Sequence, residues 1–152
     1  VIFGYVAPPP RVIGSSGTQR HERVCIVPIG LAPQLAHQTQ ILEMVARTEP
    51  LLNTLQAIVR FVEDHEPGSR CAILSVSSDR HHFSSCVAPS FPRAFHNFFS
   101  GMSIDPSHCG VCGAAVESGH PRIVADVAAA KTYSQAWREL LLTCGCRSVL
   151  SN

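Results

Sequence analysis

The chain has 152 residues, of which 45% are hydrophobic and 15% charged, and its formal net charge is +1. This length suits one domain of ordinary size, and the high apolar content excludes an intrinsically disordered chain. A net charge near zero, with no run of like charges, gives no electrostatic support for nucleic acid or an anionic membrane as a partner. No apolar run approaches the roughly 20 residues of a membrane-spanning helix.

The first part of the chain predicts a strand, a linker and two helices. Residues 1–6 are rich in β-forming side chains, and the three prolines at 8–10 end this strand. Residues 34–47 have a helical apolar pattern, and Thr48 is a candidate N-cap for the next helix. That helix carries one apolar stripe, which we expect to pack in the core or to form a dimer seam. The stripe consists of Leu51, Leu52, Leu55, Ile58, Val59 and Val62.

The remainder of the chain predicts short strands and helices in alternation. Residues 71–76 and 82–87 form a hairpin, followed by a short helix at 93–99 and a helical turn at 113–117. A strand at 123–127 precedes a helix at 133–143, and Gly145 suits the left-handed position after that helix. Residues 146–150 begin another strand. Adjacent antiparallel strands with segregated helices indicate an α+β fold.

From about Leu51 onward, several sequence runs resemble a GAF domain. They are His-Cys-Gly-Val-Cys-Gly-Ala-Ala at 108–115, Ser-Gly-His-Pro-Arg-Ile-Val-Ala-Asp-Val at 118–127, Trp-Arg-Glu-Leu at 137–140 and Gly-Cys-Arg-Ser-Val-Leu-Ser at 145–151. The resemblance implies a GAF-like antiparallel sheet with helices packed on it. It also implies a cytoplasmic sensory module without catalysis of its own, as in bacterial cyclic-di-GMP signalling proteins (GGDEF/EAL) and sensor kinases. The output domain, a cyclase, phosphodiesterase or kinase, would lie elsewhere in the same polypeptide.

The resemblance stops at Asn152, before the last strand of the family, which normally lies in the middle of the sheet. Residues 1–10 resemble such a last strand, and residues 21–25 resemble the opening of a GAF C-terminal helix. We therefore expect a fragment of a longer protein. Residues 1–47 would be the end of a preceding GAF-like domain plus a linker helix, and residues 48–152 a GAF domain truncated before its C-terminal strand. We also expect residues 1–6 to fill the vacant strand position.

The resemblance implies a small-molecule pocket between the sheet and the segments above it. Aromatic and motif residues are the candidates for lining it, although the sequence names neither the ligand nor a cofactor. These candidates are Phe91, Phe95, Phe98, Cys112, Asp126 and Trp137. The helix at 49–64 is the expected homodimer seam.

Seven cysteines without a secretion signal indicate a reducing compartment and leave an alternative function open. Cys109, Cys112, Cys144 and Cys146 could hold zinc or act in redox sensing, because thiolates in fours suit tetrahedral zinc. A third alternative is an enzyme similar to free methionine-(R)-sulfoxide reductases, whose chemistry needs a reactive thiolate. The stretch at 128–133 holds no cysteine where that family has its nucleophile.

Overall fold

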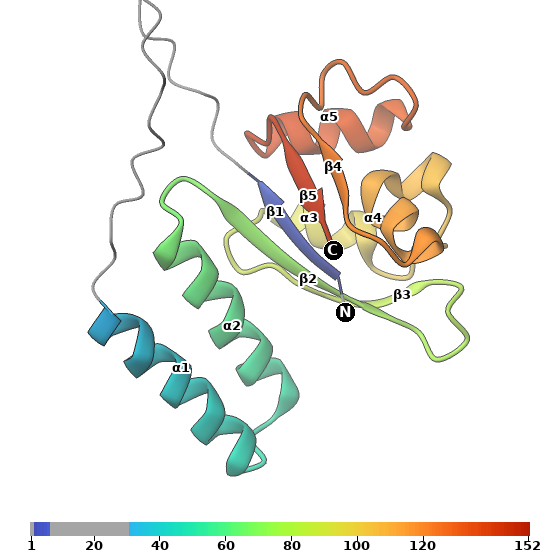
Figure 1. Cartoon of the computed structure of the whole chain (residues 1–152). Coiled ribbons are helices and arrows are strands. Elements are labelled where there is room, and N and C mark those ends of the chain that lie inside the picture. Colours follow the sequence, from blue (N-terminus) through green and yellow to red (C-terminus); the bar gives the residue numbers. More distant parts are fainter. Residues whose placement is uncertain (1, 7–30) are drawn as a thin grey trace, which may run out of the picture.

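The computed structural model describes residues 2–6 and 31–152 (Figure 1). The predicted linker and the GAF-like run at 21–25 lie outside the described residues. Five strands form one sheet in the order β3-β2-β1-β5-β4, and each described neighbouring pair is antiparallel. Their bounds are β1 Ile2–Val6, β2 Arg70–Val76, β3 Phe83–Val87, β4 Arg122–Val124 and β5 Val149–Ser151.

The strand β1 lies in the centre of this sheet, far in sequence from both of its neighbours. It pairs with β2 from Ile2 opposite Leu74 to Val6 opposite Arg70. On its other side, Gly4 lies opposite Ser151 of β5. Ladders on both sides give the backbone N–H and C=O groups of a central strand their partners. The prediction that the N-terminal strand fills the middle position of the sheet is confirmed for residues 2–6.

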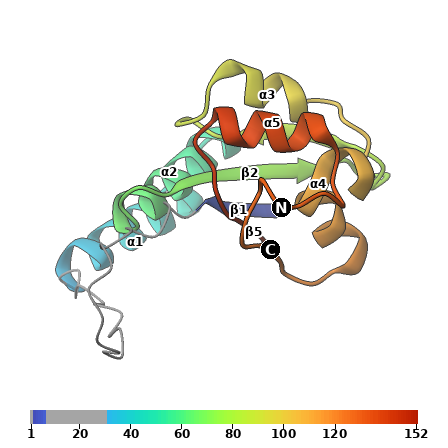
Figure 2. The same cartoon turned by 90° about the horizontal axis from the view of Figure 1, so that it is seen from above.

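The helices form two layers, one on each face of the sheet (Figures 1 and 2). The helices α1 (Leu31–Ala46) and α2 (Leu51–His65) lie on one side. The helices α3 (Arg93–Phe99), α4 (Pro106–Ser118) and α5 (Gln135–Thr143) cover the other. The larger core lies beneath α3–α5, and a smaller one lies beneath α2. This arrangement confirms the predicted α+β class.

The structure corrects three predicted boundaries. Thr48 is not the N-cap of α2: it has a positive φ of 52°, and Pro50 precedes the helix instead. The helix α4 is longer than the predicted turn at 113–117, because Asp105 caps it by accepting a hydrogen bond from the Ser107 N–H. Its non-helical residue, Gly110, marks a kink rather than an end. The strand β5 begins at Val149 instead of residue 146.

The apolar stripe of α2 is only partly a core feature. Val59 is fully buried against the sheet, with partly buried neighbours at Leu55, Ile58 and Val62. The first two leucines of α2 remain exposed, as do apolar side chains on α1. The exposed set is Leu35, Leu42, Val45, Leu51 and Leu52. Across the part of the chain that the structure describes, no helix combines the length and the apolarity needed to cross a membrane.

Candidate functional site

A closed apolar cavity lies between the sheet and α3–α5. Its volume is about 20 Å³, room for about one water molecule. Its lining comes from β2, β5 and all three covering helices or their approaches: Ala72, Leu74, Phe91, Phe95, Phe99, Cys112, Trp137, Leu141 and Val149. Two larger hollows lie at the surface, one between α1 and α2 (about 330 Å³) and one beside the β2–β3 turn (about 470 Å³). Of these three spaces, only the cavity between the sheet and α3–α5 has a wall of entirely buried aromatic side chains.

The aromatic wall of the cavity results from the spacing of the phenylalanines in and just before α3. Phe91, Phe95 and Phe99 recur every four residues, so they share one face when the segment turns into a helix. The Phe91 and Phe95 rings stack with centroids 4.0 Å apart, and Phe95 and Phe99 follow at 4.9 Å. His96 ties this helix to the end of β3, since its Nε2 lies 3.0 Å from the Ala88 carbonyl oxygen.

Trp137 forms the opposite wall and is completely buried. Ser134 caps α5 by accepting a hydrogen bond from the Trp137 backbone N–H at 3.2 Å. The same hydroxyl donates to the His108 carbonyl oxygen at 3.1 Å and so joins α5 to α4. The indole Nε1 is buried and has no hydrogen-bond partner among the described residues. A buried N–H without an acceptor is unfavourable, so Trp137 carries an unused donor in the core beside the cavity, whose own lining is apolar.

The glycines of the 108–115 run make this packing feasible. Gly110 has φ 65° and ψ −143°, a backbone conformation that is almost restricted to glycine. A Cβ at this position would lie within 3.0 Å of the Trp137 indole, and a Cβ on Gly113 would collide with Cys109 Sγ. The missing side chain of Gly113 therefore leaves room for Cys109, and that of Gly110 lets the α4 backbone lie against Trp137 of α5.

The structure brings four of the six predicted pocket residues together. Phe91, Phe95, Cys112 and Trp137 line the cavity. Phe98 does not line it and packs instead edge-on against Phe99. Asp126 is exposed and accepts a hydrogen bond from the Ala128 N–H at 2.9 Å, so it closes a turn outside the cavity. The sequence interpretation missed the other lining residues, of which Phe99 shares the four-residue spacing of Phe91 and Phe95.

The predicted metal quartet is not assembled. Over residues 31–152, no three His, Cys, Asp or Glu side chains gather closely enough to hold a metal ion. All four cysteines of the quartet are free and buried. Cys109 donates a hydrogen bond to the Asp105 carbonyl oxygen at 2.9 Å, which turns its thiol into the first turn of α4.

The buried thiols also have unfavourable electrostatics for redox chemistry. Desolvation raises the pKa of Cys86, Cys112 and Cys146 to about 12 and that of Cys71 to about 11. Burial also raises the pKa of Cys109 and Cys144. The thiolate is the reactive form of cysteine, so these six thiols are poor nucleophiles at neutral pH. This chemistry disfavours redox sensing and the reductase-like alternative, both of which need a reactive thiolate.

The motifs, the central β1 and the two-layer arrangement agree with a comparison to protein families. Searches of curated proteins and of solved structures find no match for the chain. A family model described as "GAF domain" matches residues 50–151. Since this match covers more than half of the sequence, the chain belongs to the GAF domain family, whose members act as regulatory sensory modules.

Proposed function

We propose that this chain senses a small, flat and largely apolar molecule in the cavity between Phe95 and Trp137. The observation that carries the proposal is the apolar, aromatic lining of this cavity, to which Trp137 contributes while its buried Nε1–H stays unpaired beside it. A ligand with an aromatic body and one hydrogen-bond acceptor would complement both features. The sensory module would serve a cytoplasmic bacterial signalling protein with a cyclic-di-GMP or histidine-kinase output domain in the same polypeptide.

Ligand entry would have to change the packing of the domain. A cavity of about 20 Å³ is too small for an aromatic molecule, so the Phe95 side or the Trp137 side must move outward. A ligand shifts a conformational equilibrium only when it binds the two states unequally. Displacement of α3 or α5 would supply that difference, because the closed state has no room for the ligand.

The chain contains a single tryptophan, so intrinsic fluorescence reports directly on the cavity wall. We would titrate the wild-type protein with toluene and with phenol, which adds an oxygen acceptor, and follow both emission and melting temperature. Phenol is expected to bind more tightly than toluene, and Trp137→Phe is expected to abolish that preference. In Trp137→Phe the melting temperature provides the readout.

Phe95→Ala provides a positive control, because removing the ring creates a cavity large enough for either probe. Phe98→Leu is the matched control beside the cavity and should leave binding unchanged. If Phe95→Ala binds the probes and the wild-type protein does not, the aromatic cluster is ordinary core packing and the proposal fails.

We further propose that the module forms a homodimer. The predicted seam at 49–64 contributes only Leu51 and Leu52, because the rest of its stripe faces the sheet. The exposed Leu35, Leu42 and Val45 on α1 would extend the seam. Sedimentation velocity should show a dimer that Leu42→Glu dissociates. A concentration-independent monomer would refute this part.

A further inference from the structure

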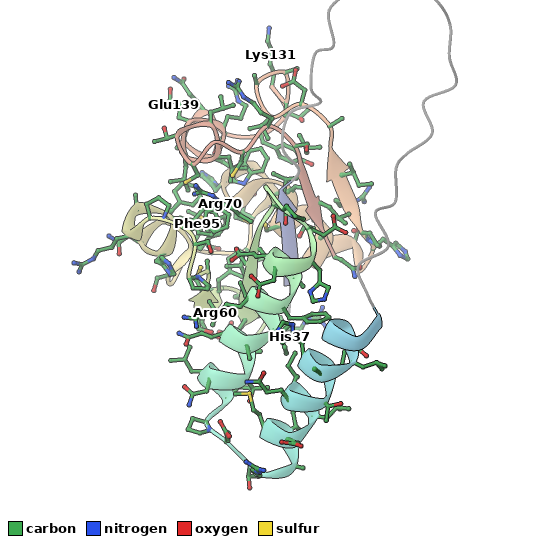
Figure 3. The ribbon with its side chains drawn as sticks, turned by 90° about the vertical axis from the view of Figure 1, so that its left-hand side faces the viewer. His37, Arg60, Arg70, Phe95, Lys131 and Glu139 are labelled. Carbon is green, nitrogen blue, oxygen red and sulfur yellow. The ribbon has the colours of Figure 1, made fainter. Side chains whose placement is uncertain are left out.

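Two histidines, His37 and His65, meet between α1 and α2. His37 lies far from Phe95 of the aromatic cavity (Figure 3). His37 lies on α1, and His65 is the last residue of α2. Their ring centroids are 5.7 Å apart, at an interplanar angle of 75°. Phe61 packs against both rings, at 5.9 Å from His37 and 4.1 Å from His65.

Each ring has one nitrogen without a partner. His37 Nδ1 and His65 Nε2 are both buried from solvent, and neither finds a hydrogen-bond partner among the described residues. Leaving a buried polar atom unpaired is unfavourable. Two such atoms on neighbouring rings therefore point to a group that would bind both.

The other nitrogen of His65 fixes its protonation pattern. His65 Nδ1 lies 2.6 Å from the Phe61 carbonyl oxygen. A carbonyl oxygen only accepts, so Nδ1 carries the hydrogen and donates it. In the neutral ring, Nε2 then holds an unprotonated lone pair. A backbone carbonyl on the far nitrogen is the usual support of a metal-binding histidine.

We propose that His37 Nδ1 and His65 Nε2 bind a divalent transition metal ion of the zinc type. Zn–N bonds of about 2.0 Å place the metal about 3.2 Å from each ring centre, so two rings at the tetrahedral angle have centres about 5.2 Å apart. The observed separation of 5.7 Å between the ring centroids is close to this value. Imidazole nitrogen is a preferred ligand for zinc, nickel and copper.

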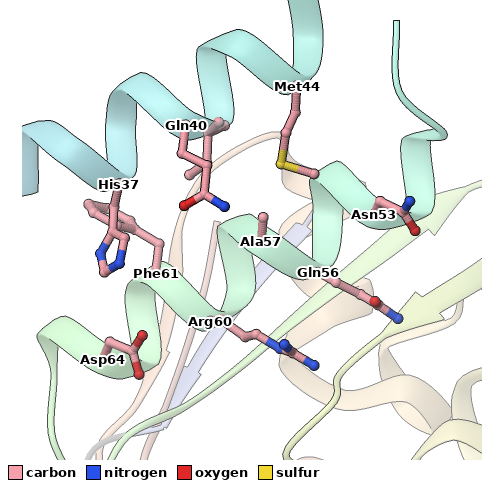
Figure 4. A pocket seen from close by; sticks show the side chains of 10 residues that line it. His37, Gln40, Met44, Asn53, Gln56, Ala57, Arg60, Phe61 and Asp64 are labelled. Carbon is pink, nitrogen blue, oxygen red and sulfur yellow. The ribbon is translucent and has the colours of Figure 1, made fainter. Parts of the chain in front are cut away.

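A groove beside His37 leaves room for water ligands on a bound cation. The two helices enclose a groove of about 330 Å³ lined by both His37 and Asp64. Asp64 lies on the His37 side of this groove, and Arg60, which also lines the groove, extends away from His37 toward Gln56 (Figure 4). No third protein ligand joins the pair over residues 31–152, so water would complete the coordination shell. The ion would fasten α1 to α2.

The test titrates the metal-free wild-type chain with ZnCl₂ by calorimetry and by NMR of the histidine ring nitrogens. We expect one zinc per chain. The His65 Nε2 and His37 Nδ1 resonances should shift, and His65 should show the Nδ1–H tautomer before metal is added. His37→Gln and His65→Gln should each weaken zinc binding at least about tenfold. Zinc should also slow hydrogen exchange along α1 in the wild type but not in His37→Gln or His65→Gln.

His108→Gln is the control, because this histidine is exposed and lies on α4. It should bind zinc as the wild type does. Circular dichroism would verify that each variant is folded, and both histidine substitutions lie outside the two cores. Zinc binding that survives both substitutions, as at a cysteine, would overturn the proposal. So would an absence of zinc binding by the wild type, which would leave a water molecule as the bridging group.

Discussion

Replacing Gly110 with alanine should destabilise the domain strongly for two separable reasons. The backbone conformation, φ 65° and ψ −143°, is one that costs a non-glycine residue about 1–3 kcal/mol. The added methyl group would also lie within 3.0 Å of the Trp137 indole, and overpacking of this kind costs about 1–3 kcal/mol. The sum of about 2–6 kcal/mol is a large share of the 5–15 kcal/mol that stabilises a typical domain.

The chain contains a second glycine with a positive φ but without the steric contact, and its ψ of 17° is the left-handed helical value. Gly119 has the same φ of 65° at the end of α4, and a Cβ there would meet nothing within 4 Å. Gly119→Ala should therefore cost only the left-handed penalty of about 1–2 kcal/mol. Urea unfolding, followed by Trp137 fluorescence and by circular dichroism, would give both free energies of unfolding. Equal losses in the two variants would refute the claim that the indole occupies the position of the missing Cβ.

Three further outcomes follow from the same structure. Removing residues 1–6 should abolish cooperative thermal unfolding, because β2 and β5 would lose the strand between them; an unchanged melting curve would contradict this. Hydrogen bonds from Ser107 hold the pKa of Asp105 below its ordinary 3.8, so the cap stabilises above that pH and is lost as the pH falls through the lowered pKa. The melting temperature of Asp105→Ala should accordingly lie below that of the wild type at pH 7 and approach it at pH 2, whereas an equal gap at both pH values would exclude the ionic contribution. Native protein treated with iodoacetamide at pH 8 should show slow alkylation of Cys109 and Cys112 by peptide mass spectrometry, and rapid labelling of either would contradict their burial.

Some features of the fold could be predicted from the sequence because the local residue patterns agree with the final structure. The stripe of α2, the hairpin at 71–87 and the glycine at 145 each carry a periodicity or a turn preference. Gly145 indeed has φ 78°. The central place of β1 was different, since no propensity specifies which strands neighbour one another. It was predictable only because the family resemblance left one strand position vacant.

The helix α4 shows why local signals also fail. A glycine within a run weakens the local signal for a helix, and the prediction of a turn at 113–117 left out the residues before Gly110. In the structure, α4 is kinked at Gly110, and the Trp137 side chain of α5 packs against this glycine. The need for glycine at position 110 comes from a tertiary contact with Trp137, and the residues next to it in sequence give no sign of that contact.

The candidate site shows the same limit. Phe98 and Phe99 are neighbours in sequence, but one position rotates a helical side chain by about 100°, so only Phe99 reaches the cavity. Cys109 and Cys112 have the C-x₂-C spacing of many metal sites, yet this spacing alone does not bring Cys109 and Cys144 together. Their separation is set by how α4 and α5 pack.

The strand β2 gives the proposed sensor a physical route between its two faces. Side chains alternate along a strand, and here Ala72 and Leu74 line the aromatic cavity whereas Cys71 and Ile73 pack under α2. Glu63 of α2 also accepts a hydrogen bond from the Cys71 N–H at 2.8 Å. Closely packed cores transmit small displacements rather than absorb them. A ligand that pushed Leu74 outward would therefore move the backbone to which α2 is attached, and through α2 the helix α1.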